Sequence, residues 1–179
     1  VNAATFERCE FVNNSGGGSG GAIRTIANLT ILESTFVGNA STRSGQLVDW
    51  GPPFPPYWSA ATVLGGAILV EQGDLVVINS TFVQNVATAL GAGGVARGGA
   101  LGISNNDSAS VVNSTFTDNT DSGETTSGAA MSFVGNGTRV LRNTLISGNT
   151  GADDALFNVN TTGSNNLIGR MDTHANFTH

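Results

Sequence analysis

The chain has 179 residues, among them seven arginines and no lysine, and its formal net charge at pH 7 is −6. The arginines are scattered from Arg8 to Arg170, so there is no basic patch to hold a nucleic acid. No apolar run approaches the ~18 residues of a membrane-spanning helix. The length and the 25 glycines predict one β-rich domain with many tight turns.

A strand-and-turn phrase recurs five times, at residues 6–14, 31–39, 77–85, 111–119 and 141–149. Each copy carries an apolar residue near its end: Phe11, Phe36, Phe82, Phe116 and Ile146. Each also carries an asparagine three positions later: Asn14, Asn39, Asn85, Asn119 and Asn149. The copies are short and rich in β-branched residues, which favours strands over helices.

A second phrase, Gly-Gly-Ala followed by Ile or Leu, comes after each copy at 20–23, 65–68 and 98–101. It returns as Gly-Ala-Ala-Met at 128–131 and weakly at 153–156. Two phrases that alternate at irregular spacing are typical of a solenoid whose rungs tolerate insertions. The sequence therefore predicts an all-β, right-handed parallel β-helix of five to six rungs over residues 1–169, with a tail at 170–179.

Stacked rungs lie about 4.8 Å apart, so equivalent residues of successive copies form columns. We expect the five apolar residues to form an internal ladder. We expect the five asparagines to form a second ladder at a corner, since Asn tolerates left-handed backbone and its amide can bond to the neighbouring rung. Both ladders are interpreted as structural.

Nearly all length variation falls between that asparagine and the next glycine pair, so the inserts belong to one corner of the solenoid. The longest insert, 40–64, holds all four prolines together with Trp50, Phe54, Tyr57 and Trp58. Stiff, proline-rich backbone can present aromatic rings to a sugar or peptide ligand. Two alternatives are that the loop packs back against its own β-helix, and that it contacts another subunit.

The alternation of Phe-x-x-Asn with Gly-Gly-Ala over residues 5–157 resembles the repeat of the polymorphic outer membrane protein family. Residues 141–150 and 165–169 also resemble the last rungs of the choice-of-anchor Q type of bacterial surface β-helix, and this match ends after Gly169. The first resemblance implies a secreted adhesin and the second a bacterial surface protein. Neither implies a catalytic residue.

Residues that could carry chemistry are dispersed. The acidic residues are scattered, and the one adjacent aspartate pair, Asp153-Asp154, lies at the weakest rung. His174 and His179 stand outside the repeats, and the single Cys9 cannot form an internal disulfide and is expected to be a small buried filler. We therefore expect no catalytic residue, no cofactor and no metal site.

Nine asparagines stand in Asn-x-Ser/Thr sequons, which are N-glycosylation acceptors in secreted proteins. Asn39 is one of them but is assigned to the corner ladder. The remaining candidates are Asn13, Asn28, Asn79, Asn106, Asn113, Asn136, Asn160 and Asn176. The alternative is that these residues are only strand and turn polars, since Asn79 and Asn113 occupy the same strand position of the repeat.

The leading functional hypothesis is an extracellular or cell-surface structural protein, a glycosylated fibre or surface-layer subunit. Its rungs begin at Thr5-Phe6 without a capping helix, so we expect either a fragment of a longer solenoid or end-to-end stacking into a homopolymer, and the hypothesis takes the second. The alternative is an adhesin that binds glycans through the aromatic loop 40–64. A polysaccharide-active enzyme is the third and least favoured.

Overall fold

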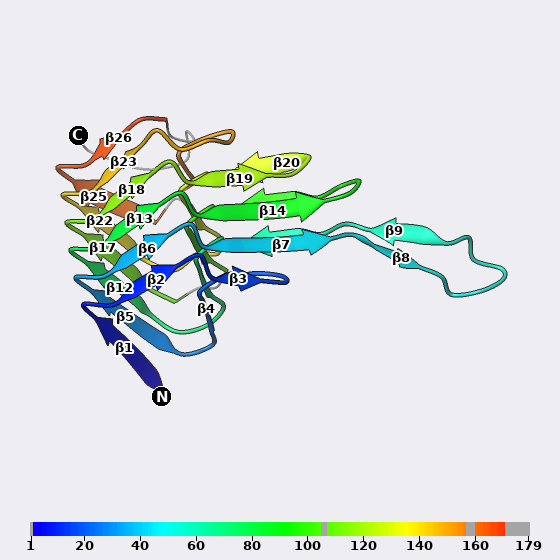
Figure 1. Ribbon diagram of the computed structural model, residues 1–179, viewed down its shortest axis with the longest axis horizontal. Helices are drawn as coiled ribbons and strands as arrows, with labels where there is room; N and C mark the ends of the chain where they lie inside the picture. The colour runs from blue at the N-terminus through cyan, green and yellow to red at the C-terminus, as the bar shows by residue number, and fades with distance from the viewer. Residues whose placement is uncertain (1, 105–106, 157–159, 171–179) are drawn as a thin grey trace.

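The computed structural model describes residues 2–104, 107–156 and 160–170, and in these ranges every regular element is a β-strand. The chain winds into coils that lie one on another from the N-terminus to the C-terminus (Figure 1). Two of its parallel sheets contain six strands each, which corresponds to six coils. The chain is therefore a parallel β-helix, and the fold class predicted from the repeats is confirmed.

Two neighbouring sides of the coil, here called side 1 and side 2, are the six-stranded sheets. Side 1 contains β1 (Ala3–Glu7), β5 (Asn28–Leu32), β12 (Leu75–Ile78), β17 (Ala109–Val112), β22 (Arg139–Arg142) and β25 (Thr161–Ser164). Side 2 contains β2 (Glu10–Val12), β6 (Thr35–Val37), β13 (Thr81–Val83), β18 (Thr115–Thr117), β23 (Leu145–Ser147) and β26 (Leu167–Ile168). In each coil a short turn joins the two sides.

That turn contains one left-handed residue in every coil. Its members have φ between 47° and 55°: Arg8, Glu33, Asn79, Asn113, Asn143 and Asn165. The repeat alone places Asn79 and Asn113 in strands, but both lie in this turn, and both are exposed. Asparagine suits the position because its short polar side chain tolerates left-handed backbone.

Side 3 closes the coil with β4 (Ile23–Thr25), β11 (Ile68–Val70), β16 (Leu101–Ile103), β21 (Met131–Phe133) and β24 (Ala155–Leu156). The glycine pair before β4, β11 and β16 explains the second phrase. Gly65 has φ +68°, and a Cβ there would collide with the Ile68 carbonyl. At Gly66 a Cβ would collide with the Gly99 carbonyl of the next coil, so the pair allows backbones of adjacent coils to touch.

Between side 2 and side 3 the chain leaves the coil and returns, and the paired excursions form a projection here called the fin (Figure 1). The outgoing strands are β3 (Ser15–Gly16), β7 (Ala40–Ser44), β14 (Val86–Leu90) and β19 (Thr120–Ser122). The returning strands are β10 (Thr62–Leu64), β15 (Val95–Arg97) and β20 (Thr125–Ser127). The ends of the inserts predicted from the sequence are thus strands of two parallel sheets.

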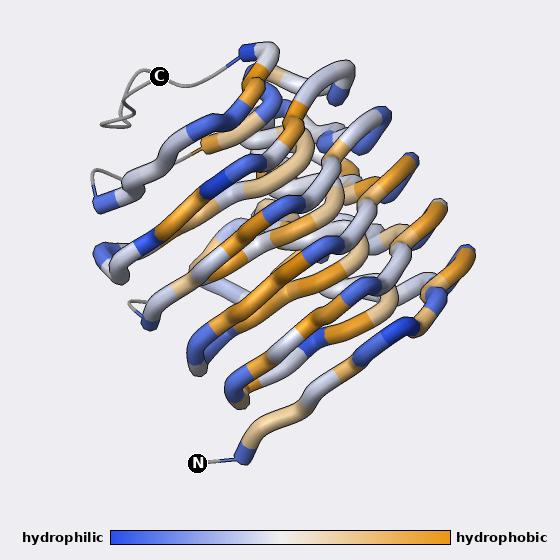
Figure 2. Tube along the Cα trace, turned by 90° about the vertical axis from the view of Figure 1, so that its left-hand side faces the viewer, coloured by the Kyte–Doolittle hydropathy of each residue, from blue (hydrophilic) through white to orange (hydrophobic). Residues whose placement is uncertain are grey.

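A column of stacked phenyl rings runs through the core behind side 2. Ring centroids lie 4.5 Å apart from Phe11 to Phe36, 4.7 Å from Phe36 to Phe82 and 4.5 Å from Phe82 to Phe116. Ile146 pairs in register with Phe116 and extends the column. The spacing equals the separation of paired strands, so the parallel register itself produces the stack. Figure 2 shows apolar and polar segments in register from coil to coil.

A ladder of asparagine side chains runs beside the phenyl column. Its first four members each donate from Nδ2 to the Oδ1 of the asparagine in the next coil over 2.8–2.9 Å, and the ladder consists of Asn14, Asn39, Asn85, Asn119 and Asn149. The last donates to Asp154 Oδ1, which ends the ladder. Asn39 Nδ2 also donates to the Phe11 carbonyl, and its Oδ1 also accepts the Asn14 amide. All four side-chain hydrogen-bonding positions of this buried amide are thereby used.

A second polar column, which the sequence did not reveal, lies at the turn between sides 1 and 2. Ser34 Oγ accepts the Cys9 amide at 3.1 Å, and Ser80 Oγ accepts the Ser34 amide at 3.1 Å. Ser114 Oγ accepts the Ser80 amide at 3.2 Å. Cys9 occupies the first position of this column, with Sγ 3.3 Å from the Glu7 carbonyl oxygen. Its side chain is half-buried, so the prediction that Cys9 is a small buried residue is wrong.

Candidate functional site: the aromatic arm

Residues 46–59 leave the end of the fin as a two-stranded antiparallel hairpin, here called the arm (Figure 1). Its strands are β8 (Gln46–Val48) and β9 (Tyr57–Ser59), which pair with each other and with no other described strand. Gly45 lies at its base, where a Cβ would come within 2.6 Å of the Ser59 carbonyl oxygen. The close approach of the two chain segments at the arm base therefore requires glycine at position 45. The strands of the arm make no strand pair with the described strands of the fin.

The tip of the arm is built from prolines and local hydrogen bonds. Asp49 Oδ1 accepts the Gly51 amide at 2.8 Å, and the Phe54 amide donates to the Gly51 carbonyl at 3.1 Å. The four prolines at 52, 53, 55 and 56 lack amide hydrogens and restrict φ. The tip therefore holds its shape without a hydrophobic core.

The aromatic side chains of the arm face solvent. Exposed fractions are 71% for Trp50, 63% for Phe54, 50% for Tyr57 and 64% for Trp58. The interpretation in which this loop packs back against its own β-helix is therefore wrong. Several large exposed apolar side chains on one projecting hairpin mark an interaction region more often than singly scattered ones do.

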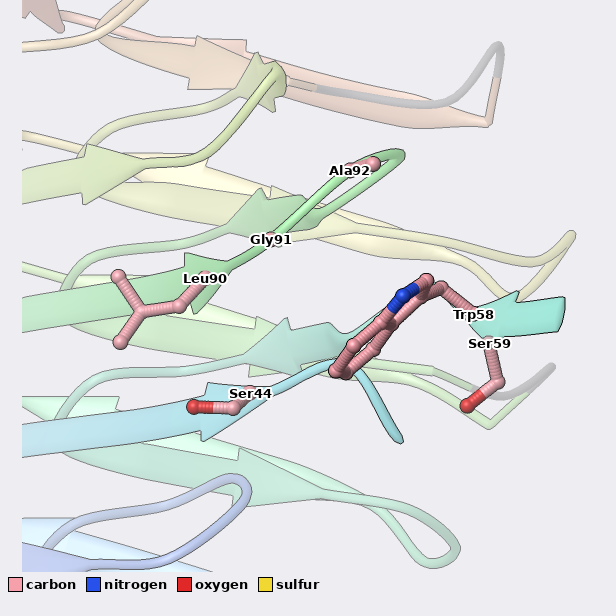
Figure 3. Close-up of a pocket in the computed structure, with 7 residues that line it drawn as sticks. Ser44, Trp58, Ser59, Leu90, Gly91 and Ala92 are labelled. Atoms are coloured by element: carbon pink, nitrogen blue, oxygen red, sulfur yellow. The ribbon is translucent and has the colours of Figure 1, made fainter. Parts of the chain in front are cut away.

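Trp58 forms one wall of a hollow between the arm and the fin. The hollow has a volume of about 340 Å³, and its opposite wall is the turn Leu90-Gly91-Ala92 of the next coil (Figure 3). Ser44 and Ser59 also line the hollow, and the Ser59 hydroxyl accepts the Gln46 amide at 3.3 Å and donates to the Gln46 carbonyl at 3.1 Å. Sequence reasoning identified Trp58 but missed Leu90, Gly91 and Ala92. The only indication in the sequence that these residues lie near Trp58 was that segments 86–97 and 40–64 are inserts at the same corner of the solenoid.

The four aromatic residues predicted as one loop site are not brought together. Leu47 pairs across the strands with Trp58, so these two side chains share one face of the arm. Tyr57 is next to Trp58 in the strand and points to the opposite face. Trp50 and Phe54 line a separate hollow of about 350 Å³ at the tip. The arm thus offers a base site at Trp58 and a tip site at Trp50.

A buried carboxyl group lies in the fin. Asp121 is 4% exposed, and neither carboxylate oxygen has a hydrogen bond of good geometry within the described residues. Burial, with a smaller contribution from the charge of Asp153, raises the pKa of Asp121 to about 7, although hydrogen bonds from the amides of Ser127 and of Asp121 itself oppose the shift. The described residues contain no group of three His, Cys, Asp or Glu side chains that could hold a metal ion.

A buried arginine lies in side 1. Arg139 occupies an inward position in register with Ala109, and burial lowers the pKa of its guanidinium. The guanidinium carbon lies 5.7 Å from the centroid of the Phe133 ring, where a cation–π interaction is favourable. Ala109 is small enough to leave room for the longer side chain above it. Arg139 belongs to the core and not to the arm.

The sequon asparagines fall into three groups. Asn13, Asn79, Asn113, Asn136 and Asn160 are exposed. Asn28 is half-buried and its Oδ1 accepts the Asp74 amide at 2.9 Å, whereas Asn39 is fully buried in the ladder. Asn106, Asn176, His174 and His179 lie outside the described residues.

The described residues include no helix that is long and apolar enough to cross a bilayer. Comparisons with protein-family models, with curated proteins and with solved structures find no match for the chain. The class of protein is therefore defined by its own architecture. It is a parallel β-helix with a lateral fin and a projecting aromatic hairpin.

Proposed function

We propose that the chain is a non-catalytic extracellular surface protein of the adhesin type, which binds saccharides on other surfaces through its arm. The observation that carries this proposal is the exposed indole of Trp58 over an open hollow at the arm base. The β-helix serves as the rigid scaffold, because its ladders fix the fin from which the arm projects. The resemblance to polymorphic outer membrane proteins and to choice-of-anchor Q proteins supports the same class.

The chemistry of the hollow suits a sugar ring. One face of a pyranose presents C–H groups, which pack well against the flat face of an indole. Its hydroxyls need polar partners at the rim, and the Ser44 hydroxyl and the indole N–H of Trp58 can supply them, whereas the Ser59 hydroxyl is already bonded to the backbone of Gln46. The opposite wall at Leu90 limits how far the ring can slide along the arm.

The test is a glycan array probed with the full chain, followed by calorimetric titration of each glycan that binds. We expect Trp58→Ala to lower affinity by about tenfold or more, as loss of an aromatic contact residue does. Tyr57→Ala is the matched control, since it removes a neighbouring exposed ring from the opposite face of the arm. Equal binding by both variants, or no glycan bound by the intact chain, contradicts the proposal.

The structural fibre or surface-layer subunit predicted from the sequence stays a prediction. The exposed arm favours one form of it, in which arm aromatics clamp neighbouring subunits together. Light scattering of the chain with residues 46–58 deleted separates the two roles. Assembly that is lost with the arm supports the clamp, whereas assembly that survives leaves the arm free to bind ligand.

Glycosylation is part of the same proposal. Asn79 and Asn113 stand at the same exposed turn in adjacent coils, about 4.8 Å apart along the axis. A first sugar on one side chain would occupy the space of the other, so we expect at most one of the two to be modified per molecule. Glycopeptide mass spectrometry of native material tests this, and Asn39 should be unmodified because it is buried.

A further inference from the structure

The fin lacks one strand on the N-terminal side of β7. The next coil covers β7 with five paired positions, from Val86↔Ala40 to Leu90↔Ser44. The first coil covers it with only two, Ser15↔Ala40 and Gly16↔Ser41. Among the described residues, Thr42, Arg43 and Ser44 therefore have no strand partner on that side, and β8 continues this open edge outward (Figure 1).

A hollow of about 640 Å³ lies along this open edge. One wall is formed by five consecutive residues, 42–46, and the other by the turn 17–19 together with Arg24. A Cβ at Gly17 or Gly18 would meet nothing within 4 Å, so the far wall leaves free space. The hollow is thus an elongated groove beside a strand edge.

The backbone of β7 presents hydrogen-bonding groups to this groove. The Ala40 amide donates to Asn14 O in the first coil at 2.8 Å, whereas the Gly45 amide donates to Leu90 O in the next coil at 2.9 Å. Successive residues of a strand direct their amides and carbonyls to opposite sides. The N–H and C=O of Ser44 therefore point toward the groove, where an added strand would bond to them.

The groove is also electropositive, in a chain whose net charge is −6. Arg43 and Arg24 line it, and no acidic side chain does. Arg24 is bonded to Glu71, whereas Arg43 forms no ion pair with any residue that the structure describes. An incoming carboxylate would give Arg43 a charge-assisted partner.

We propose that this groove binds an extended peptide segment of a partner protein by β-strand addition, with an acidic side chain of the segment paired to Arg43. The segment occupies the place that a longer first-coil strand would fill, one strand spacing below β7. Main-chain hydrogen bonds to the Ser44 edge hold it, and Arg43 selects its charge. This groove lies on the side of the first coil, whereas the Trp58 hollow lies against the next coil, and the two share Ser44 and Gly45 in their linings.

The test begins with selection of a phage-displayed random heptapeptide library on the full chain. Enriched peptides are then made synthetically and titrated by fluorescence anisotropy up to about 1 mM. We expect the enriched sequences to contain an acidic residue. We expect Arg43→Gln and Ser44→Pro each to weaken binding by about tenfold or more, because the first removes the charge and the second the edge N–H.

Two control variants isolate the groove. Arg142→Gln removes an exposed charge on side 1, and Trp58→Ala removes the arm-base ring, and both should bind the peptide within about twofold of the intact chain. Unchanged binding by both Arg43→Gln and Ser44→Pro, or no enrichment, overturns the inference. So does a dimer seen by light scattering that Ser44→Pro dissolves, because a second copy would then fill the edge.

Discussion

The coil and the fin of this protein are built on the same parallel register but packed very differently. The coil encloses a column of phenyl rings with leucine, isoleucine and valine around it. The core of the fin consists of Ala61, Val63, Ala87, Ala89 and Ala96, and the arm beyond it has exposed aromatic side chains. Regions with few buried contacts tolerate changes of sequence and move most easily. Both candidate binding surfaces, at the arm base and along the open edge of the fin, lie in such regions.

The same comparison holds for polar groups. In the coil, every asparagine of the ladder is bonded to its neighbours, so burial costs little. In the fin, Ser41 and Asp121 stand in the same column and have buried oxygens without a partner within the described residues. The asparagine ladder therefore satisfies the buried amides that it contains, whereas Ser41 and Asp121 are polar groups that weaken the fin. Three substitutions and one deletion measure this contrast.

The largest effect is expected in the phenyl column. Phe82→Ala removes a ring stacked on both Phe36 and Phe116 and leaves a cavity that the rigid coil cannot close. We expect the free energy of unfolding to fall by about 3–5 kcal/mol, measured by urea denaturation. Phe54→Ala at the exposed arm tip is the control and should cost below about 0.5 kcal/mol. Similar losses at both sites would remove the distinction between coil and arm.

The asparagine ladder should come next. Asn85→Ala leaves the buried Asn39 side chain without its acceptor and the Phe36 carbonyl without its donor. We expect a loss of roughly 2–4 kcal/mol in unfolding free energy, because each unpaired buried group is costly. Asn14→Ala, at the exposed end of the ladder, should cost about 1 kcal/mol or less. A neutral Asn85→Ala would show that the ladder contributes register and not stability.

Asp121 should make stability depend on pH. Its folded pKa of about 7 lies above the ordinary 3.8, so the folded state holds this proton more tightly than the unfolded state. The resulting stabilisation is complete below pH ~4 and is lost as the pH rises through 7. Asp121→Asn cannot titrate, so its unfolding free energy should gain roughly 2–3 kcal/mol relative to the parent between pH 5 and pH 8.

Asp118→Asn is the control for this measurement, since it removes a charge at an exposed turn of the same coil. Its difference from the parent should stay nearly constant over the same pH range. A pH profile that Asp121→Asn leaves unchanged would mean that the fin opens enough to hydrate the carboxylate.

The smallest effect is expected in the arm. Deleting residues 46–58 removes the β8–β9 hairpin and no strand pair of the coil or the fin. We expect the thermal midpoint to change by about 2 °C or less, as for a surface change with ΔΔG below about 0.5 kcal/mol. Calorimetry checks this. A large drop would show that the arm braces the fin, and would make the deletion unsuitable for testing ligand binding.

The coil could be predicted from the amino-acid repeat alone. Phe11, Phe36, Phe82 and Phe116 recur at one repeat position, and a parallel solenoid must place such residues one above another. The asparagines three residues later follow the same rule, as do the glycine pairs. The serine column at the turn between sides 1 and 2 was not evident from the sequence. Ser34, Ser80 and Ser114 occupy equivalent positions, but other coils have Cys9, Thr144 and Asn166 there.

The fin, the arm and the sites beside them could be located only in the folded chain. The sequence placed Trp58 in an insert but could not show whether its ring is buried, because no repeat constrains a segment that occurs once. It could not join Trp58 to Leu90, or Arg43 to Gly17, because those contacts arise between coils of different excursion length. The repeat determines the structure that all coils have in common, whereas the contacts between inserts of different length become visible only in the folded chain.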